Sequence, residues 1–301
     1  MPSVIDPGEG DAIALDELVA ALDAERGDLA DEERLASFGP LLARLARNRD
    51  FLADLALAEL KARHRVDSNI GGYGAQVLML RPANGRYVLR ANFWPAEQDA
   101  VVRASGTAPF FYHHAHDHNF SFLTVGYAGP GYWSDYYEYD VEGVVGVPGE
   151  KVDLRFVECA RLESGKVLLY RAQRDVHVQL PPDSFSVSFN ILAAEPSQIW
   201  RDQFRFDIAA GTIAETLTTA PSEALVALAV HLGGGDGHDL AHAFAEHHPN
   251  PRMRVTAIVA LASAAPDRAA RRAVIERAAA DPDRTVAGHA RRRLALLEND
   301  P

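Results

Sequence analysis

The segment from Tyr112 to Tyr127 reads YHHAHDHNFSFLTVGY, and the rest of the chain is interpreted around it. Side chains alternate across a β-strand with period two, so a strand here would place His114, His116 and His118 on one face. Neutral imidazole is the commonest protein ligand for first-row transition metals. The pattern therefore predicts a metal site at the end of a buried, β-prone stretch. The alternative interpretation is a surface cluster of histidines that change charge near neutral pH.

The bulk composition narrows the class of protein. With 301 residues the chain is long enough for one or two domains with hydrophobic cores. A formal charge of −12 argues against a nucleic-acid partner, and the sequence lacks an apolar run long enough for a membrane span. Cys159 is the only cysteine, so an internal disulfide is excluded, and its strand context predicts a buried apolar residue. The acidic N-terminus is unlike a signal peptide, and we expect a cytoplasmic protein.

Hydrophobic periodicity predicts an α+β chain in three parts. Residues 1–68 carry leucines at helical spacing and are expected to form an N-terminal helical segment. Residues 69–205 contain short β-prone runs separated by glycine and proline, as in an antiparallel barrel or sandwich. Residues 206–301 are alanine-rich and predicted to be helical, without strands. The expected strands are Gln76–Arg81, Arg86–Trp94, Tyr132–Tyr139, Lys151–Cys159, Lys166–Tyr170, Val176–Leu180 and Ser184–Leu192.

The last part contains two similar segments. They are NPRMRVTAIVALAS from Asn250 and DPDRTVAGHARRRL from Asp281, offset by 31 residues. An Asx-Pro start before an apolar helix resembles the second helix of a HEAT-like repeat. This part is interpreted either as a module that contacts a protein partner or as a structural cap. The first 60 residues carry 14 acidic and 5 basic side chains, whereas residues 251–301 carry 6 acidic residues and 10 arginines. The two ends could therefore attract each other within a monomer or across a homodimer.

Residues 70–195 resemble the cupin superfamily, whose small antiparallel β-barrels (double-stranded β-helices) hold a metal between two histidine motifs. The first motif matches His116-Asp117-His118, with Gly129 at the expected distance. The usual glutamate of that motif falls on Phe122 or Leu123, neither of which can coordinate a metal. The second motif matches the segment from Gly165 to His177, one residue longer than usual and without the Pro-x-Gly turn.

The resemblance implies that His116, His118 and His177 are the metal ligands. Three neutral histidines without a carboxylate resemble the ligand set of the thiol dioxygenases of this superfamily. Fe(II) is then the expected metal, with Mn, Ni, Cu or Zn as alternatives. The expected function is a cupin-type oxidoreductase, a dioxygenase that acts on a small polar, amino-acid-like substrate and O₂. The alternatives are a metal-dependent isomerase or lyase, and a non-catalytic cupin that senses a ligand. His114 and Glu138 are further candidate ligands.

Residues on neighbouring strands could complete such a site. Arg90 shares one face of its strand with Val88, Asn92 and Trp94, and its planar fork suits a substrate carboxylate. Tyr137 is a candidate hydrogen-bond or proton donor near the metal, as is Tyr139. On the segment 184–192, a small polar face with Ser186, Ser188 and Asn190 suits either a pocket wall or solvent.

Overall fold

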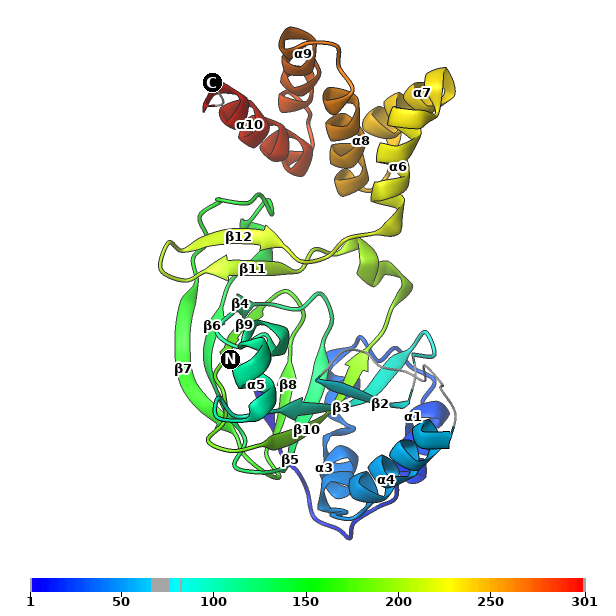
Figure 1. The fold of residues 1–301 in the computed structure, drawn as a ribbon, viewed down its shortest axis with the longest axis vertical. Helices are drawn as coiled ribbons and strands as arrows, with labels where there is room; N and C mark the ends of the chain where they lie inside the picture. Colours follow the sequence, from blue (N-terminus) through cyan, green and yellow to red (C-terminus); the bar gives the residue numbers. More distant parts are fainter. Residues whose placement is uncertain (1, 66–75, 82, 300–301) are drawn as a thin grey trace. The chain divides into compact units, whose positions relative to one another are not determined.

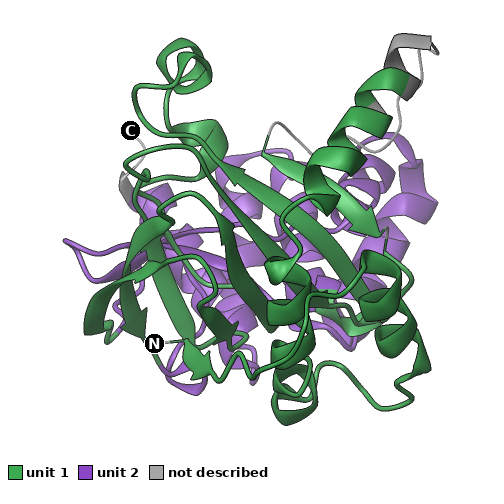
Figure 2. Cartoon of the chain, turned by 90° about the horizontal axis from the view of Figure 1, so that it is seen from below, with its two compact units in different colours: residues 1–139, 153–198 green, residues 140–152, 199–301 purple. Residues whose placement is uncertain are grey.

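The computed structural model describes residues 2–65, 76–81 and 83–299. The chain divides into two compact units, which Figure 2 colours separately: residues 1–139 with 153–198, and residues 140–152 with 199–301. The division into three parts near residues 68 and 205 stays a prediction, and its first boundary falls outside the described residues.

The larger sheet of the first unit is antiparallel, with the strand order β1-β8-β5-β10-β3-β2. Its strands are β1 (Ser3–Ile5), β2 (Val77–Arg81), β3 (Tyr87–Trp94), β5 (Phe122–Ala128), β8 (Val167–Tyr170) and β10 (Ser186–Ala193). The turn between β2 and β3 uses Asn84 and Gly85, and Gly85 has a φ angle of +82°. A positive φ is readily adopted by glycine, which explains this residue in a tight turn. Pro82, also expected in this turn, lies outside the described residues.

A second sheet within the first unit has the strand order β4-β9-β6-β7 and is also antiparallel. Its strands are β4 (Ala115–His116), β6 (Tyr132–Glu138), β7 (Arg155–Leu162) and β9 (Asp175–Gln179). Cys159 on β7 is exposed, so the prediction of a buried cysteine is wrong. The side chain lies on the strand face that is not covered by the core, and this could not be read from its apolar character alone.

The two sheets of the first unit share one hydrophobic core. Phe122 and Tyr170 of the larger sheet pack in the same buried cluster as Tyr136 and Leu162 of the smaller one. Because side chains alternate along each strand, the intervening residues of β5, β8 and β10 point the other way. Those residues pack against the N-terminal helices seen beside β3 and β5 in Figure 1. These helices are α1 (Leu15–Ala24), α2 (Glu32–Ala36), α3 (Gly39–Arg47) and α4 (Phe51–Arg65), and a short helix α5 spans Ala100–Ser105.

The expected α+β chain with antiparallel sheets is confirmed, but two expectations on the strands need correction. The described pairings join strands within each sheet and do not include ones that would close a barrel. The histidine segment is also not one strand. Residues 115–116 form β4 in one sheet, residues 117–121 are irregular, and β5 begins at Phe122 in the other sheet. Period-two alternation cannot reveal a break of this kind, because each half of the segment fits a strand.

The second unit begins its second segment with a β-hairpin. Strands β11 (Phe204–Asp207) and β12 (Thr212–Thr216) pair antiparallel, with Phe204, Phe206 and Ile213 buried. The prediction of helices only beyond residue 205 is therefore wrong at this point. The strands are short and carry charged residues on their exposed positions, so their pattern was weak.

The other segment of the second unit, residues 140–152, is a loop held by Glu150. The carboxylate of Glu150 accepts hydrogen bonds from the backbone N–H groups of residues 145–147.

Helices of the second unit follow the hairpin and pack side by side (Figure 1). They are α6 (Pro221–Leu232), α7 (Gly234–His247), α8 (Pro251–Ser263), α9 (Arg268–Ala279) and α10 (Arg284–Asn299). The Asn250 side chain caps α8 by accepting from the backbone N–H groups of Arg252 and Met253. None of the described helices has the length and apolar character needed to cross a membrane.

Candidate metal centre

Strand pairing brings two of the predicted ligands together across the smaller sheet. His116 on β4 lies directly opposite His177 on β9. His118 follows in the irregular stretch after β4, and its backbone carbonyl accepts a hydrogen bond of 2.7 Å from the N–H of Gln173. Gln173 adopts a φ angle of +53° in the turn that precedes β9. The turn before His177 therefore also fixes the backbone of His118.

The three imidazole rings converge through their Nε2 atoms. The Nε2 atom of His177 lies 3.0 Å from that of His116 and 3.2 Å from that of His118. One ring nitrogen from each histidine lies within 4.8 Å of the others. Among the described residues, this is the one group of histidine, cysteine and carboxylate side chains with the spacing of a metal site.

The nitrogen spacing fits a bound divalent ion. At a metal–nitrogen distance of about 2.0–2.1 Å, two ligand atoms lie about 2.8–3.0 Å apart at a right angle and about 3.3–3.4 Å apart at a tetrahedral angle. The two distances to His177 Nε2 fall within or next to these ranges. Three neutral nitrogen donors suit Fe(II), Zn(II), Cu(II) or Ni(II) alike, so the donor set does not identify the metal.

A backbone carbonyl orients the ring of His116. The Nδ1 atom of His116 lies 2.8 Å from the carbonyl oxygen of His114, which only an Nδ1–H can satisfy. In the neutral ring this hydrogen bond leaves the lone pair on Nε2, the atom that faces the other histidines. His177 differs, because its Nδ1 is buried without a hydrogen-bond partner among the described residues. Thus one of the candidate ligands, His116, has the expected supporting hydrogen bond, and His114 contributes through its backbone.

Aromatic side chains surround the three histidines, of which His116 and His177 are buried and His118 is half-buried. The ring of His116 contacts Phe111 at 4.6 Å between centroids, and that of His118 contacts Phe122 at 4.9 Å. His177 contacts Tyr170 at 4.9 Å, and its side chain is 1 % exposed. Burial lowers the pKa of His116 to about 4. Burial, followed by the neighbouring charges, also holds the pKa values of His118 and His177 well below the usual range. The rings are therefore neutral at pH 7 and competent to bind a cation.

An ion-pair network holds the turn between β8 and β9. The guanidinium of Arg171 donates to both carboxylate oxygens of Asp175, at 3.0 Å from Nε and 2.5 Å from Nη2. A second contact of Nη2, at 2.7 Å, reaches Glu138 on β6. Asp175 is 1 % exposed and lies two residues before His177. The network therefore fixes the start of the strand that carries the third histidine.

The other predicted site residues are placed differently from one another. Arg90 lies on the inner face of β3. Burial is the largest cause that lowers the pKa of His118, the charge of His116 is the next, and the positive charge of Arg90 is the third. Tyr137 lies on the outer face of β6, where its ring packs against Phe156 at 5.3 Å, so the structure does not bring it to the histidines. Glu138 engages Arg171 and Arg155 and is not in the group with metal-site spacing.

One inner polar residue of the larger sheet, Thr124, was not singled out from the sequence. Thr124 on β5 is fully buried, and its hydroxyl has no hydrogen-bond partner among the described residues. It lies two residues from Phe122, whose ring contacts His118. In the run FSFLTVGY a threonine is expected in a strand because its side chain is β-branched. Its hydroxyl therefore did not stand out as a candidate functional group. Alternation from Phe122 was the signal that could have found it, because residues 122 and 124 share one face.

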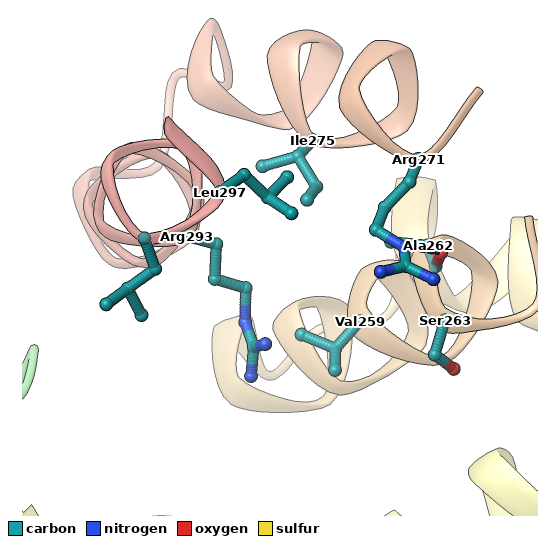
Figure 3. Close-up of a pocket in the computed structure, with 8 residues that line it drawn as sticks. Val259, Ala262, Ser263, Arg271, Ile275, Arg293 and Leu297 are labelled. Carbon is teal, nitrogen blue, oxygen red and sulfur yellow. Dashed lines mark hydrogen bonds between the residues drawn. The ribbon is translucent and has the colours of Figure 1, made fainter. Parts of the chain in front are cut away.

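The helical part of the second unit also contains a pocket, shown in Figure 3. It lies among α8, α9 and α10 and has a volume of about 270 Å³. Arg271 and Arg293 line it together with Ile275 and Leu297. Its lining residues include no histidine, cysteine or carboxylate, so this described pocket offers no metal ligands.

Comparisons with known proteins identify distant structural similarities only. No family model matches the sequence, and no curated protein matches it. One solved structure, of the DMSP lyases RdDddP and RnDddQII, has 11 % identity and a TM-score of 0.24, and the match covers 40 % of this chain and 44 % of that one. A cupin protein from Bacteroides fragilis has 14 % identity, a TM-score of 0.23, and coverage of 43 % and 85 %.

The DMSP lyase DddQ from Ruegeria pomeroyi DSS-3 has 9 % identity, a TM-score of 0.25, and coverage of 64 % and 79 %. The chain thus spans less than half of the first of these chains and more than two thirds of the other two. Similarities of this size carry no argument about activity. The fold and the candidate site rest on the two antiparallel sheets and on the three converging histidines.

Proposed function

We propose that the protein is a cupin-type dioxygenase that binds Fe(II) through His116, His118 and His177 and acts on a small polar, amino-acid-like substrate. The observation that carries this proposal is the convergence of the three Nε2 atoms, with 3.0 and 3.2 Å separations to His177, in a buried site. An Fe(II) ion held by three neutral imidazoles supplies open coordination positions for a substrate and O₂ side by side.

The hydroxyl groups near the histidines bear on the choice between oxygenase chemistry and proton abstraction. A lyase or isomerase needs a general base near the reacting carbon. Tyr136 and Tyr170 carry interior hydroxyls 3.0 Å apart, and burial raises the pKa of Tyr136 to about 12 and holds that of Tyr170 well above its usual value. Both therefore stay protonated at pH 7, and one hydroxyl donates its hydrogen bond to the other. Asp175, the neighbouring carboxylate, is engaged by Arg171.

Arg90 is proposed to bind the substrate carboxylate. Arg90 lies on the inner face of β3, and its charge lowers the pKa of His118. The guanidinium therefore interacts electrostatically with the histidine cluster. With three neutral ligands, the site presents positive charge from the ion and from Arg90, and it should favour an anionic substrate group.

Two measurements on the anaerobically purified protein test the proposed function. Elemental analysis should find about one equivalent of iron, and this metal should be lost from the His177→Ala variant while the fold is retained. Oxygen uptake should depend on the substrate during turnover. Turnover without oxygen uptake would favour the lyase or isomerase, and tight ligand binding without turnover would favour the sensing protein.

The helical part is proposed to be HEAT-like and to contact a protein, either a partner or a second copy of the chain. Support comes from the similar segments on α8 and α10, and from the packing of α8 against both α6 and α10 in addition to its sequence neighbours. Stacked helix pairs pack in this manner. Light scattering on the purified full chain tests the homodimer, which predicts a doubled mass. A monomeric mass would leave a different protein as the partner.

A further inference from the structure

The inner face of the larger sheet carries polar residues in a defined row. Strand register places Asn190 on β10 between Arg90 on β3 and Thr124 on β5. Asn92 lies two residues along β3 from Arg90, opposite Ser188. Directly opposed residues on one face have Cβ atoms about 4.5–5.5 Å apart, and diagonal neighbours remain within reach of longer side chains. These residues therefore form one continuous patch, which we call the polar row: Thr124, Asn190, Asn92 and Arg90.

Three side chains of the polar row are buried with unsatisfied oxygens. Thr124 is 0 %, Asn190 is 2 % and Asn92 is 6 % exposed. The hydroxyl of Thr124 and the amide oxygens of both asparagines have no hydrogen-bond partner among the described residues. Buried polar atoms are nearly always paired in folded proteins, because an unpaired one keeps the cost of leaving water. Three on one patch indicate a group that the fold does not itself supply.

A neighbour on the same face shows how the fold satisfies a polar group that it uses for structure. Ser188 lies two residues along β10 from Asn190, on the same face, and it accepts a hydrogen bond of 2.9 Å from the indole N–H of Trp94. Ser188 is 1 % exposed, as deeply buried as Asn190. The missing partners of Thr124, Asn190 and Asn92 are therefore not a general feature of this interior.

The polar row lies one layer along the strands from the histidines. Phe122 and Tyr170 are opposed across β5 and β8, and their rings contact His118 and His177 respectively. Thr124 is two residues from Phe122 on the same face, a rise of about 6.5–7 Å along the strand. The polar row and the rings that contact the histidines therefore lie on the same face of the larger sheet, one layer apart.

We propose that Thr124, Asn190 and Asn92 bind the primary ammonium group of an α-amino acid, with its carboxylate at Arg90 and its side chain toward the three histidines. The inference deepens the proposed function and rests on it for the role of the histidines. The chemistry follows from matching donors to acceptors: an ammonium group has three N–H donors and no acceptor, and the polar row offers three unsatisfied oxygens. The planar guanidinium of Arg90 matches a carboxylate in two parallel hydrogen bonds.

Two nearly isosteric variants and one matched control separate a binding role from a structural one. Thr124→Val and Asn190→Leu remove the unsatisfied oxygen at nearly unchanged volume, and Ser188→Ala removes a satisfied one. Without ligand, we expect the urea midpoint of Thr124→Val to equal or exceed that of the parent protein. The midpoint of Ser188→Ala should fall, because the N–H of Trp94 loses its acceptor. Equal losses in Thr124→Val and Ser188→Ala would overturn the proposal, since the hydroxyl of Thr124 would then have a structural partner.

Ligand binding is measured without oxygen, using the twenty standard amino acids and, for each that binds, the carboxylic acid that lacks the amino group. At least one amino acid should raise the thermal midpoint of the metal-loaded protein, and its des-amino analogue should bind more weakly. Thr124→Val and Asn190→Leu should each weaken the amino acid about ten- to hundredfold, as expected for hydrogen bonds to a charged group, and Ser188→Ala should not. Binding by none of the panel, equal binding of the des-amino acid, or unchanged affinity in both variants would overturn it.

The two proposals fail in distinguishable ways. If the dioxygenase proposal is wrong, turnover should occur without oxygen uptake. The amino acid should still raise the thermal midpoint, and this rise should still depend on Thr124. Loss of the ammonium site would appear as unchanged affinity in the Thr124→Val and Asn190→Leu variants, with iron content and oxygen uptake intact. If Asn190→Leu does not fold, Thr124→Val carries the test alone.

Discussion

The stability of the metal-free protein should fall steeply in mild acid because the folded protein holds the pKa values of the three histidines below their usual range. Burial lowers the pKa of His116 to about 4 in the folded protein, whereas an unfolded histidine titrates near about 6.5. Between these values the unfolded chain binds a proton that the native state does not. The free energy of unfolding therefore decreases as the pH falls from about 6.5 to about 4.

The size of this effect follows from the two pKa values. His116 alone should cost about 2 kcal/mol of stability at pH 5 and about 3 kcal/mol below pH 4, relative to pH 8. The pKa values of His118 and His177 are also held well below the usual range, first by burial, so their contributions have the same sign. A loss of this size is a substantial part of the stability of an ordinary domain.

Urea unfolding of the metal-free protein at pH 8, 6 and 5, followed by circular dichroism, measures the loss. His116→Gln should reduce the difference between pH 8 and pH 5, because glutamine does not titrate. His113→Gln is the matched control, since the side chain of His113 is 51 % exposed and lies outside the cluster. Stability that is unchanged between pH 8 and pH 5, or an equal effect of the two variants, would refute the reasoning.

Three further predictions can be tested with single variants. His177→Ala should lose bound metal while His114→Ala retains it in elemental analysis, because His114 contributes its backbone carbonyl; metal loss in His114→Ala alone would contradict this. Arg90→Lys should lower kcat/KM, with a rise of about 1–3 kcal/mol in the corresponding activation free energy, since lysine lacks the planar fork of arginine. Kinetics equal to those of the parent enzyme would exclude Arg90 from substrate binding. Arg252→Met should lower the free energy of unfolding by about 3 kcal/mol in urea titrations, because Glu223 loses a partly buried ion-pair partner, and a change below about 0.5 kcal/mol would exclude a structural role.

Much of the strand and helix content followed from local pattern. The strands β3, β6, β8, β9 and β10 were expected within one or two residues of their observed ends, because alternation and flanking glycine or proline are local signals. The His116-x-His118 spacing and the later His177 were also visible in the sequence. In these places the residues that decide the local structure lie within a few positions of one another.

Other features depended on which strands pair. The histidine segment splits between two sheets. Strand β6 packs its even-numbered residues inward, and this places Tyr137 on the outer face. The hairpin of β11 and β12 was missed because each strand is short and acquires its burial from contacts distant in sequence.

The sequence by itself determined which residues could bind a metal, through the number and spacing of its histidines. Only the tertiary structure decided that His116 and His177, 61 residues apart, meet with their Nε2 atoms at 3.0 Å. It also decided that the polar face of β10, equally suited to water or to a pocket, is buried beside Thr124. The physical reason is that strand register, a long-range property, sets which side chains share one enclosed face, whereas alternation sets only which ones point the same way.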